Sequence, residues 1–137
     1  MNDPGERSDP PAAAASSRSA RILVIDDEAP IGWVLTRVLR DHQVTCETDA
    51  RKALARLGQG DEFDVILCDL MMPEMTGMDF FRELIAAHPT LSKRVVFMTG
   101  GVFSRETESF LESVENRQLG KPFSADVLRA IVAEFIA

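Results

Sequence analysis

Five short apolar runs alternate along the chain with longer segments whose apolar residues recur at helical spacing. The runs lie near residues 21–25, 44–48, 63–68, 94–98 and 117–120, and the helical segments span 29–42, 49–60, 77–89, 104–114 and 124–136. Continuous apolar runs are typical of strands in parallel sheets that helices cover on both faces. Because crossovers between parallel strands are right-handed, the alternation predicts an α/β fold. We expect a doubly wound, flavodoxin-like, five-stranded parallel sheet of order 2-1-3-4-5 with five helices.

Residues 1–20 have no apolar periodicity and are rich in Pro, Ala, Ser and charged residues. Such a composition predicts a disordered tail or linker. The remaining residues, 21–137, have the length of one domain with a single fold.

The formal net charge of the chain is -7. It argues against nucleic acid as a partner, because phosphate backbones are bound by basic surfaces, and against docking on an anionic membrane. No apolar stretch is long enough to span a bilayer, and residues 1–20 lack the apolar core of a signal peptide. Cys46 and Cys68 have neither metal-site nor redox-pair spacing, and free thiols are typical of a reducing compartment. We therefore expect a cytoplasmic protein.

Polar side chains follow four of the five predicted strands. Asp26 and Asp27 follow the first, Asp69 the third, Thr99 the fourth and Lys121 the fifth. Taken singly, each has an ordinary structural explanation: a helix cap, a turn residue, a strand residue or a solvated lysine. Together they indicate a site, because the carboxyl ends of neighbouring parallel strands meet at the edge where open α/β sheets bind ligands.

Three carboxylates at one sheet edge repel one another, and a hard cation relieves that repulsion. Mg²⁺ prefers a few carboxylates together with waters and a phosphate oxygen. The cluster therefore predicts a divalent-metal site that receives a phosphoryl group, with a lysine and a threonine hydroxyl to bind its oxygens. Asp69, held by a buried strand, is placed to act as the nucleophile.

The motifs VIDDE, ILCDLMMPEMTGMDF, VVFMTGG and GKPF resemble those of the receiver domain of two-component response regulators. The resemblance runs from about Arg21 to the C-terminus. The segment from Thr99 to Phe123 is also similar to receivers fused to hybrid histidine kinases. Since no DNA-binding domain follows Ala137, the expected output is a protein contact or phosphate transfer to another protein.

The resemblance implies a role for each site residue. Asp69 is the aspartate that a histidine kinase phosphorylates, Thr99 is the switch hydroxyl, and Lys121 pairs with a phosphate oxygen. The Lys121–Pro122 bond is expected to be cis. Slow loss of phosphate from Asp69 is expected, but not turnover on external substrates.

The resemblance also implies the ligands of Mg²⁺, the expected cofactor. Asp27 binds the ion directly and Asp26 through water, together with Asp69 and the backbone carbonyl of Met71. A homodimer through the fourth helix, the fifth strand and the fifth helix is a further expectation.

One position departs from the family pattern. Gln118 stands three residues before the lysine, where the family has an aromatic ring that turns inward on activation. This departure keeps a phosphate-independent interaction module as an alternative function. An aspartyl-nucleophile phosphatase is a third hypothesis, but phosphatases of the haloacid-dehalogenase type place a second acid two residues after the nucleophile, where this chain has Met71.

Overall fold

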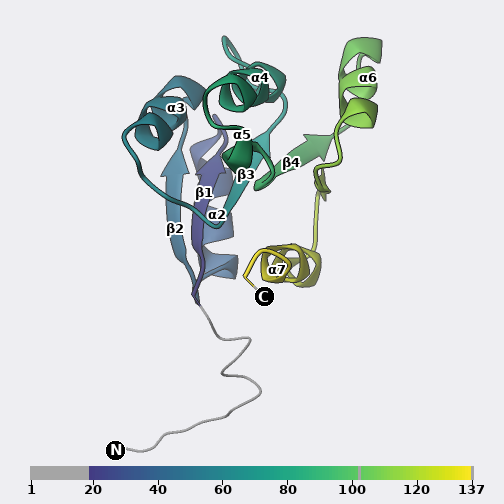
Figure 1. The fold of residues 1–137 in the computed structure, drawn as a ribbon. Coiled ribbons are helices and arrows are strands. Elements are labelled where there is room, and N and C mark those ends of the chain that lie inside the picture. The colour runs from purple at the N-terminus through teal and green to yellow at the C-terminus, as the bar shows by residue number, and fades with distance from the viewer. Residues whose placement is uncertain (1–18, 102, 137) are drawn as a thin grey trace, which may run out of the picture.

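The computed structural model describes residues 19–101 and 103–136. The elements follow in the order β1 (Arg21–Ile25), α2 (Ala29–Val38), β2 (Gln43–Glu47), α3 (Ala50–Gly58), β3 (Val65–Asp69), α4 (Gly77–Ala87), α5 (Pro89–Ser92), β4 (Val95–Gly100), α6 (Arg105–Ser113), β5 (Gln118–Lys121) and α7 (Ala125–Ala133). The strands form one parallel sheet of order β2-β1-β3-β4-β5 (Figure 1). The predicted doubly wound, flavodoxin-like sheet and its strand order are confirmed.

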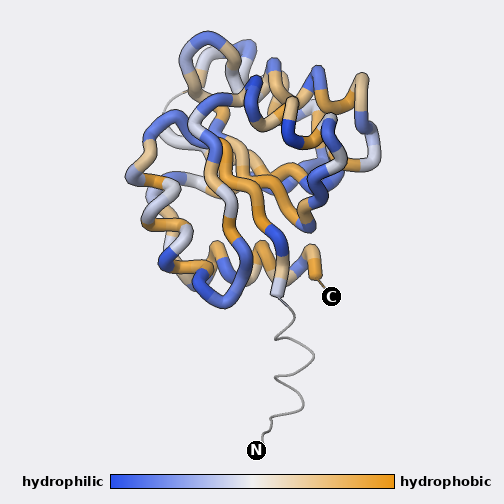
Figure 2. Tube along the Cα trace, turned by 90° about the vertical axis from the view of Figure 1, so that its left-hand side faces the viewer, coloured by the Kyte–Doolittle hydropathy of each residue, from blue (hydrophilic) through white to orange (hydrophobic). Residues whose placement is uncertain are grey.

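The sheet separates two apolar cores, because successive strand residues point to opposite faces. One core joins the sheet to α3, α4 and α6 and includes Leu23, Ile66, Phe97, Phe81 and Phe110. The other joins it to α2 and α7 and includes Val24, Leu67, Met98, Leu35 and Leu128. Figure 2 shows the apolar strands inside and polar turns of the chain outside. Burial on both faces explains why the three central strands, β1, β3 and β4, read as continuous apolar runs.

Side-chain caps fix where several helices begin. Asp49 accepts a hydrogen bond from the Arg51 N–H, and Ser124 accepts one from the Val127 N–H. Thr76 and Asp79 form a reciprocal capping box at the start of α4. Each cap satisfies a backbone donor that the first helical turn leaves unpaired.

A sixth helix within the described residues was not predicted. Pro89, the last residue of the predicted helical segment 77–89, opens the one-turn helix α5. Proline suits a first helical position, since its missing N–H would be unpaired there in any case. The five longer helices correspond to the five predicted segments. None of the helices in the described part of the chain has the length and apolar character that crossing a membrane requires.

The predicted tail falls outside the described residues except for Ser19 and Ala20. Ala20 is buried, its N–H donates to Nδ1 of His42 at 2.9 Å, and its carbonyl accepts from the Gln43 N–H at 2.9 Å. The chain is thus held against the sheet one residue before β1 begins.

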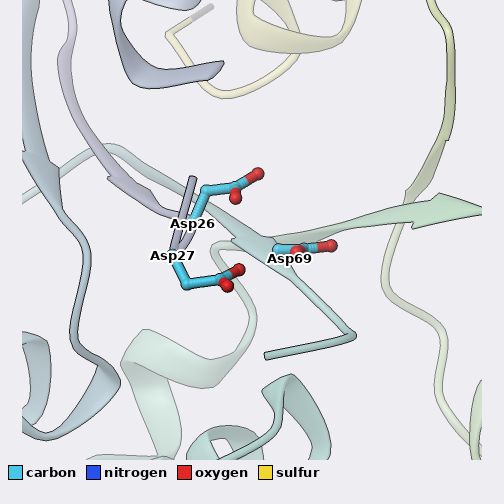
Figure 3. A group of neighbouring side chains, drawn as sticks. All are labelled: Asp26, Asp27 and Asp69. Atoms are coloured by element: carbon cyan, nitrogen blue, oxygen red, sulfur yellow. The ribbon is translucent and has the colours of Figure 1, made fainter. Parts of the chain in front are cut away.

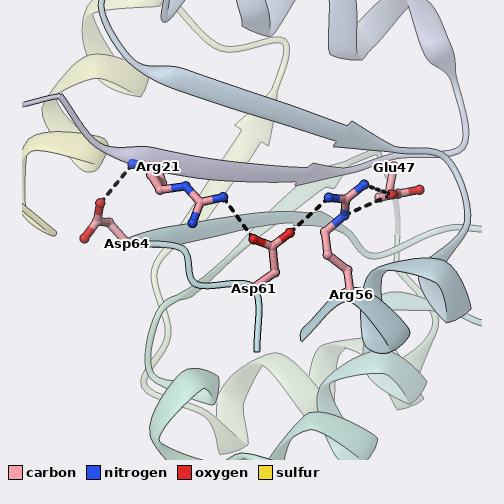
Figure 4. Close-up of polar contacts among 5 residues, drawn as sticks. All are labelled: Arg21, Glu47, Arg56, Asp61 and Asp64. Atoms are coloured by element: carbon pink, nitrogen blue, oxygen red, sulfur yellow. Dashed lines mark hydrogen bonds and ion pairs between the residues drawn. The ribbon is translucent and has the colours of Figure 1, made fainter. Parts of the chain in front are cut away.

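A line of ion pairs connects α3 with the first two strands (Figure 4). Arg56 on α3 contacts Glu47 at 2.7 Å and Asp61 at 3.0 Å, and Asp61 also contacts Arg21 at 3.0 Å. The paired side chains are partly exposed, so solvent screens each pair and its contribution to stability is small. The backbone carbonyl of Glu47 accepts the Asp26 N–H at 3.1 Å, so the anchored end of β2 also supports the start of the acidic cluster.

Candidate functional site

Strand pairing brings the predicted acids together at one edge of the sheet. Ile25 of β1 pairs with Cys68 of β3, so the next residue of each strand, Asp26 and Asp69, lie side by side. Figure 3 shows both side chains with that of Asp27 at the ends of β1 and β3. One carboxylate oxygen from each lies within 4.8 Å of the others.

The donor set of this cluster fits a hard divalent cation. Three carboxylates are the kind of ligand that Mg²⁺ takes, completed by waters or phosphate oxygens. Asp26 and Asp69 are buried, with 3% and 7% of their surface exposed, whereas Asp27 is exposed. Asp27 is therefore the acid of the cluster that is most open to solvent.

Both carboxylate oxygens of Asp26 have partners within the chain. Oδ1 accepts the backbone N–H of Glu28 at 2.9 Å, and Oδ2 accepts from Nζ of Lys121 at 3.0 Å. Sequence reasoning missed the contact with Glu28. The contact could have been predicted from the two-residue spacing of Asp26 and Glu28, because an aspartate side chain readily accepts the backbone N–H two residues further along the chain.

Lys121 reaches this cluster from the far side of the sheet. It is the last residue of β5, and β4 and β3 lie between that strand and β1. Its ammonium group contacts Asp26 at 3.0 Å and Asp69 Oδ1 at 3.4 Å. The Lys121–Pro122 peptide bond is cis, as the resemblance implies. The lysine therefore forms ion pairs with two acids, and the shorter contact is the one to Asp26.

Burial and mutual repulsion shape the ionisation of the cluster. Burial raises the pKa of Asp69, and the nearby charge of Asp26 raises it further, against the opposing effects of Lys121 and the Met71 N–H. Burial lowers the pKa of Lys121, but its contacts with Asp26 and Asp69 outweigh this, so the net pKa is raised. The site thus holds its lysine charged while it disfavours charge on Asp69.

Thr99 and Met71 stand beside this group of charges. Asp69 pairs with Met98, so Thr99 lies one residue beyond it on the neighbouring strand β4, and it is 7% exposed. Thr99 continues the face that Phe97 presents to α4 and α6.

The Met71 N–H hydrogen-bonds to the Asp69 carboxylate, while the Met71 side chain is 58% exposed. The role of the Met71 carbonyl as a metal ligand stays a prediction.

A small hollow of about 130 Å³ lies on the Asp27 side of the cluster. Across it, Arg51 at the start of α3 pairs at 3.6 Å with Glu74 of the loop after β3. Glu74 has a positive φ of 67°, which few residues other than glycine adopt. Sequence reasoning did not identify this pair, because an exposed charge in a helix and another in a distant loop share no sequence pattern.

The sequence profile of one family, described as the response regulator receiver domain, matches residues 22–133. The chain belongs to that family. This receiver domain is 32% identical over 118 residues to the DNA-binding transcriptional regulator NtrC of Salmonella typhimurium, covering 85% of this chain and 24% of the relative. It is 28% identical over 125 residues to the sensor kinase CckA of Brucella abortus, covering 88% of this chain and 13% of the relative. The chain thus spans a quarter or less of these two relatives.

Solved structures of receiver domains share the fold. A receiver domain protein from Clostridium thermocellum is 28% identical with a TM-score of 0.72, covering 85% of this chain and 94% of its own. The receiver domain of the sensor histidine kinase PA1611 from Pseudomonas aeruginosa is 26% identical with a TM-score of 0.73, covering 87% and 98%. In the latter structure a magnesium ion is coordinated in the active site cleft. The acidic cluster of the present receiver domain is consistent with such a site.

Proposed function

We propose that this receiver domain accepts a phosphoryl group from a histidine kinase onto Asp69 and relays the signal to another protein. One observation carries the proposal: Asp69 ends a buried strand beside two further carboxylates within 4.8 Å and a lysine ammonium group 3.4 Å away. A nucleophile needs a fixed position, and the transferred group needs positive charge around it. The buried strand supports the first requirement, and Lys121, together with the cation that the carboxylates would hold, supports the second. The domain is proposed to work in the cytoplasm.

The reaction is an in-line displacement at phosphorus. An Asp69 oxygen forms the new bond, the phosphorus–nitrogen bond of the donor phosphohistidine breaks, and its electron pair leaves with the imidazole. Mg²⁺, bound by Asp27 and Asp69 with Asp26 through water and the Met71 carbonyl, would supply charge that stabilises the phosphoryl oxygens. Lys121 lies where it can bind one of those oxygens in turn.

Turnover of external phosphate esters is not part of the proposal. Met71 stands where an aspartyl phosphatase of the haloacid-dehalogenase type has its second acid. The hollow that Asp27 lines is about 130 Å³, well below the roughly 300–1,000 Å³ of typical small-molecule sites. These features favour a phosphoacceptor that loses its own phosphate slowly.

The phosphoryl group adds roughly -1.5 to -2 charge, and Thr99 is proposed to respond to it. With Gln118 exposed on β5, the loop between β4 and α6 is the better candidate to carry the response. Phe103 in that loop packs partly buried on the same core as Phe97, whereas Leu119 is buried in the opposite core. A crystal structure with a phosphoryl mimic in which residues 100–104 do not move would refute this route.

The surface of α6, β5 and α7 is proposed to present the change, either to a downstream protein or phosphotransfer domain or to a second copy of the chain. Analytical ultracentrifugation with and without the phosphoryl mimic tests the homodimer. An unchanged sedimentation coefficient at high protein concentration would leave the downstream protein or phosphotransfer domain as the proposed partner of this surface.

The central experiment is phosphorylation by acetyl phosphate or a partner kinase in the presence of Mg²⁺. Asp69→Asn removes the nucleophilic oxygen, so we expect no aspartyl phosphate to form. The circular dichroism spectrum should be unchanged. Asp126→Asn is the matched control, since its side chain is 98% exposed on α7, and it should be phosphorylated as the wild type is. Intact-protein mass spectrometry that found Asp69→Asn fully labelled would remove Asp69 from the role.

A further inference from the structure

A groove runs between α4 and α6, on the face of the sheet opposite to α2 and α7. It consists of two adjoining hollows of about 530 and 510 Å³, which share the side chains of Phe81, Ile85 and Val114. The lining residues come from α4, α5, α6 and the segments that directly follow α5 and α6. The groove therefore differs from the surface of α6, β5 and α7 that is proposed above to present the response.

The floor of the groove is apolar and already formed. Phe81 of α4 and Phe110 of α6 are 4% and 9% exposed, and their ring centroids lie 5.7 Å apart in an edge-to-face contact. Both rings also contact Phe97 of β4, at 5.1 and 5.3 Å. At one end of the groove the Asn116 side chain donates to two backbone carbonyls near the start of β4, each at 2.8 Å. A partner would therefore have to order little of this floor on binding.

The two walls of the groove carry opposite charges. The charged lining residues are Arg82 and Lys93 on the side of α4 and α5, and Glu106 and Glu115 on the side of α6. The guanidinium group of Arg82 lies 5.8 Å from the centroid of the Phe110 ring, above the floor, and pairs with Asp79 of its own helix at 3.5 Å. Within residues 19–101 and 103–136, no ion pair joins one wall to the other. Both walls can therefore pair with charges on a partner.

The walls also differ in the size of their side chains. Ile85 on α4 is 45% exposed, and it extends the apolar floor upward. On α6, Ser109 and Ser113 line the groove about one helical turn apart, and the Ser113 hydroxyl already donates to the Phe110 carbonyl at 2.7 Å. A large side chain facing small ones leaves room for the side chains of an added helix to interdigitate.

A helix suits this groove better than an extended segment does. Both long walls are helices, whose backbone N–H and C=O groups bond internally. An extended chain would find no strand to pair with, and its own backbone groups would lose water without gaining partners. A helix satisfies its own backbone and presents apolar residues at i, i+3, i+4 and i+7 on one face.

We propose that the groove between α4 and α6 binds an amphipathic helix of a partner protein, whose apolar stripe has acidic residues along one side and basic residues along the other. The acidic side faces Arg82 and Lys93, and the basic side faces Glu106 and Glu115. This inference goes beyond the proposed phosphotransfer, because the groove and its charges are present in the unmodified chain.

Three fluorescent helical peptides test the proposal by anisotropy titrations with the whole chain at physiological salt. All carry leucines at i, i+3, i+4 and i+7 and differ only along the two sides of that stripe. The mixed peptide has glutamates on one side and lysines on the other, the acidic peptide has glutamates on both, and the basic peptide has lysines on both. We expect the mixed peptide to bind about fivefold more tightly than either of the others, because it alone matches both walls.

A charge-reversal variant should change that preference. Arg82→Glu combined with Lys93→Glu makes both walls acidic, so this variant should bind the basic peptide more tightly than the mixed one. Both side chains are exposed, and an unchanged circular dichroism spectrum would show that the fold is kept. Arg40→Glu combined with Lys52→Glu is the matched control. It changes the net charge equally at exposed residues outside the groove, so it should keep the wild-type preference.

The proposal is overturned if the mixed peptide does not bind at a protein concentration of about 1 mM, or if the charge-reversal variant keeps the wild-type preference. A mixed peptide with a central proline cannot form the helix and should not bind; equal binding would assign the groove to an extended segment instead. A wild-type dimer in sedimentation that the charge-reversal variant loses would assign it to a second copy of the chain. All these measurements use the unphosphorylated protein, so either failure leaves the proposed function standing.

Discussion

Gly77 is predicted to be a site where one added methyl group disturbs the phosphoacceptor strand. It is the first residue of α4, and its N–H donates to the Leu70 carbonyl at 3.0 Å. A Cβ there would lie 2.5 Å from the Asp69 carbonyl oxygen and 2.9 Å from Leu70 Cα. Both are backbone atoms, so no side chain can rotate away and the end of β3 must shift.

The magnitude for Gly77→Ala follows from two opposing effects. Overpacking of this kind costs about 1–3 kcal/mol, and alanine returns at most about 1 kcal/mol through its helix propensity. The free energy of unfolding should therefore fall by about 1–2 kcal/mol, and the melting temperature by roughly 4–8 °C for a domain of this size. Because the clash involves the backbone of Asp69, phosphorylation by acetyl phosphate should also become slower.

Urea denaturation followed by far-UV circular dichroism measures the change. Fluorescence is less suitable, because Trp33 is already 68% exposed in the folded protein. Gly58→Ala is the matched control: Gly58 ends α3, and a Cβ there meets nothing within 4 Å. It should leave stability unchanged or raise it by up to about 1 kcal/mol. The reasoning is refuted if Gly77→Ala is as stable as the wild type, or if Gly58→Ala loses as much.

Three further outcomes are expected. Asp27→Ala should weaken Mg²⁺ binding at least tenfold in calorimetry without lowering the free energy of unfolding, because Asp27 is exposed; unchanged affinity would count against it as a ligand. Asp69→Asn should stabilise the metal-free protein at pH 7, since the raised pKa of Asp69 means that its ionised form opposes folding. That gain should shrink as the pH falls through the raised pKa toward the unfolded value of about 4, and urea titrations that found it constant with pH would contradict the assignment. A thiol reagent should label Cys46 alone in the native protein and also Cys68 after unfolding, because Cys68 is buried and its pKa is raised by that burial and by nearby acids; rapid labelling of both thiols would disagree.

Much of the fold was predictable because burial on both faces leaves a plain sequence signal. The alternation of segments predicted the doubly wound parallel sheet, and 2-1-3-4-5 is one of the common strand orders of such sheets. The helical segments predicted to begin at Asp49 and Ser124 do begin with these residues as caps. The positions of the strand ends were predicted less accurately. Asp69 and Thr99 lie inside β3 and β4 rather than after them, because backbone pairing continues past the last apolar residue.

The internal arrangement of the site was beyond sequence reasoning. That the acids would meet followed from topology, but the partner of Lys121 did not. A four-carbon stem reaches several atoms at a crowded edge, and only packing decides that it meets Asp26 more closely than Asp69. The short helix α5 was missed for a related reason, since one turn is too brief to show periodicity.

Residues that continue the two opposite faces of the sheet lie beside Asp69. Lys121 continues the alternation of Leu119, which belongs to the layer with α2 and α7, while Thr99 continues that of Phe97, in the layer with α4 and α6. Phosphorylation of Asp69, as proposed, would therefore act on an ammonium group that belongs to one layer and on a hydroxyl that belongs to the other. A single phosphorylation would then affect both apolar cores, which the sheet separates.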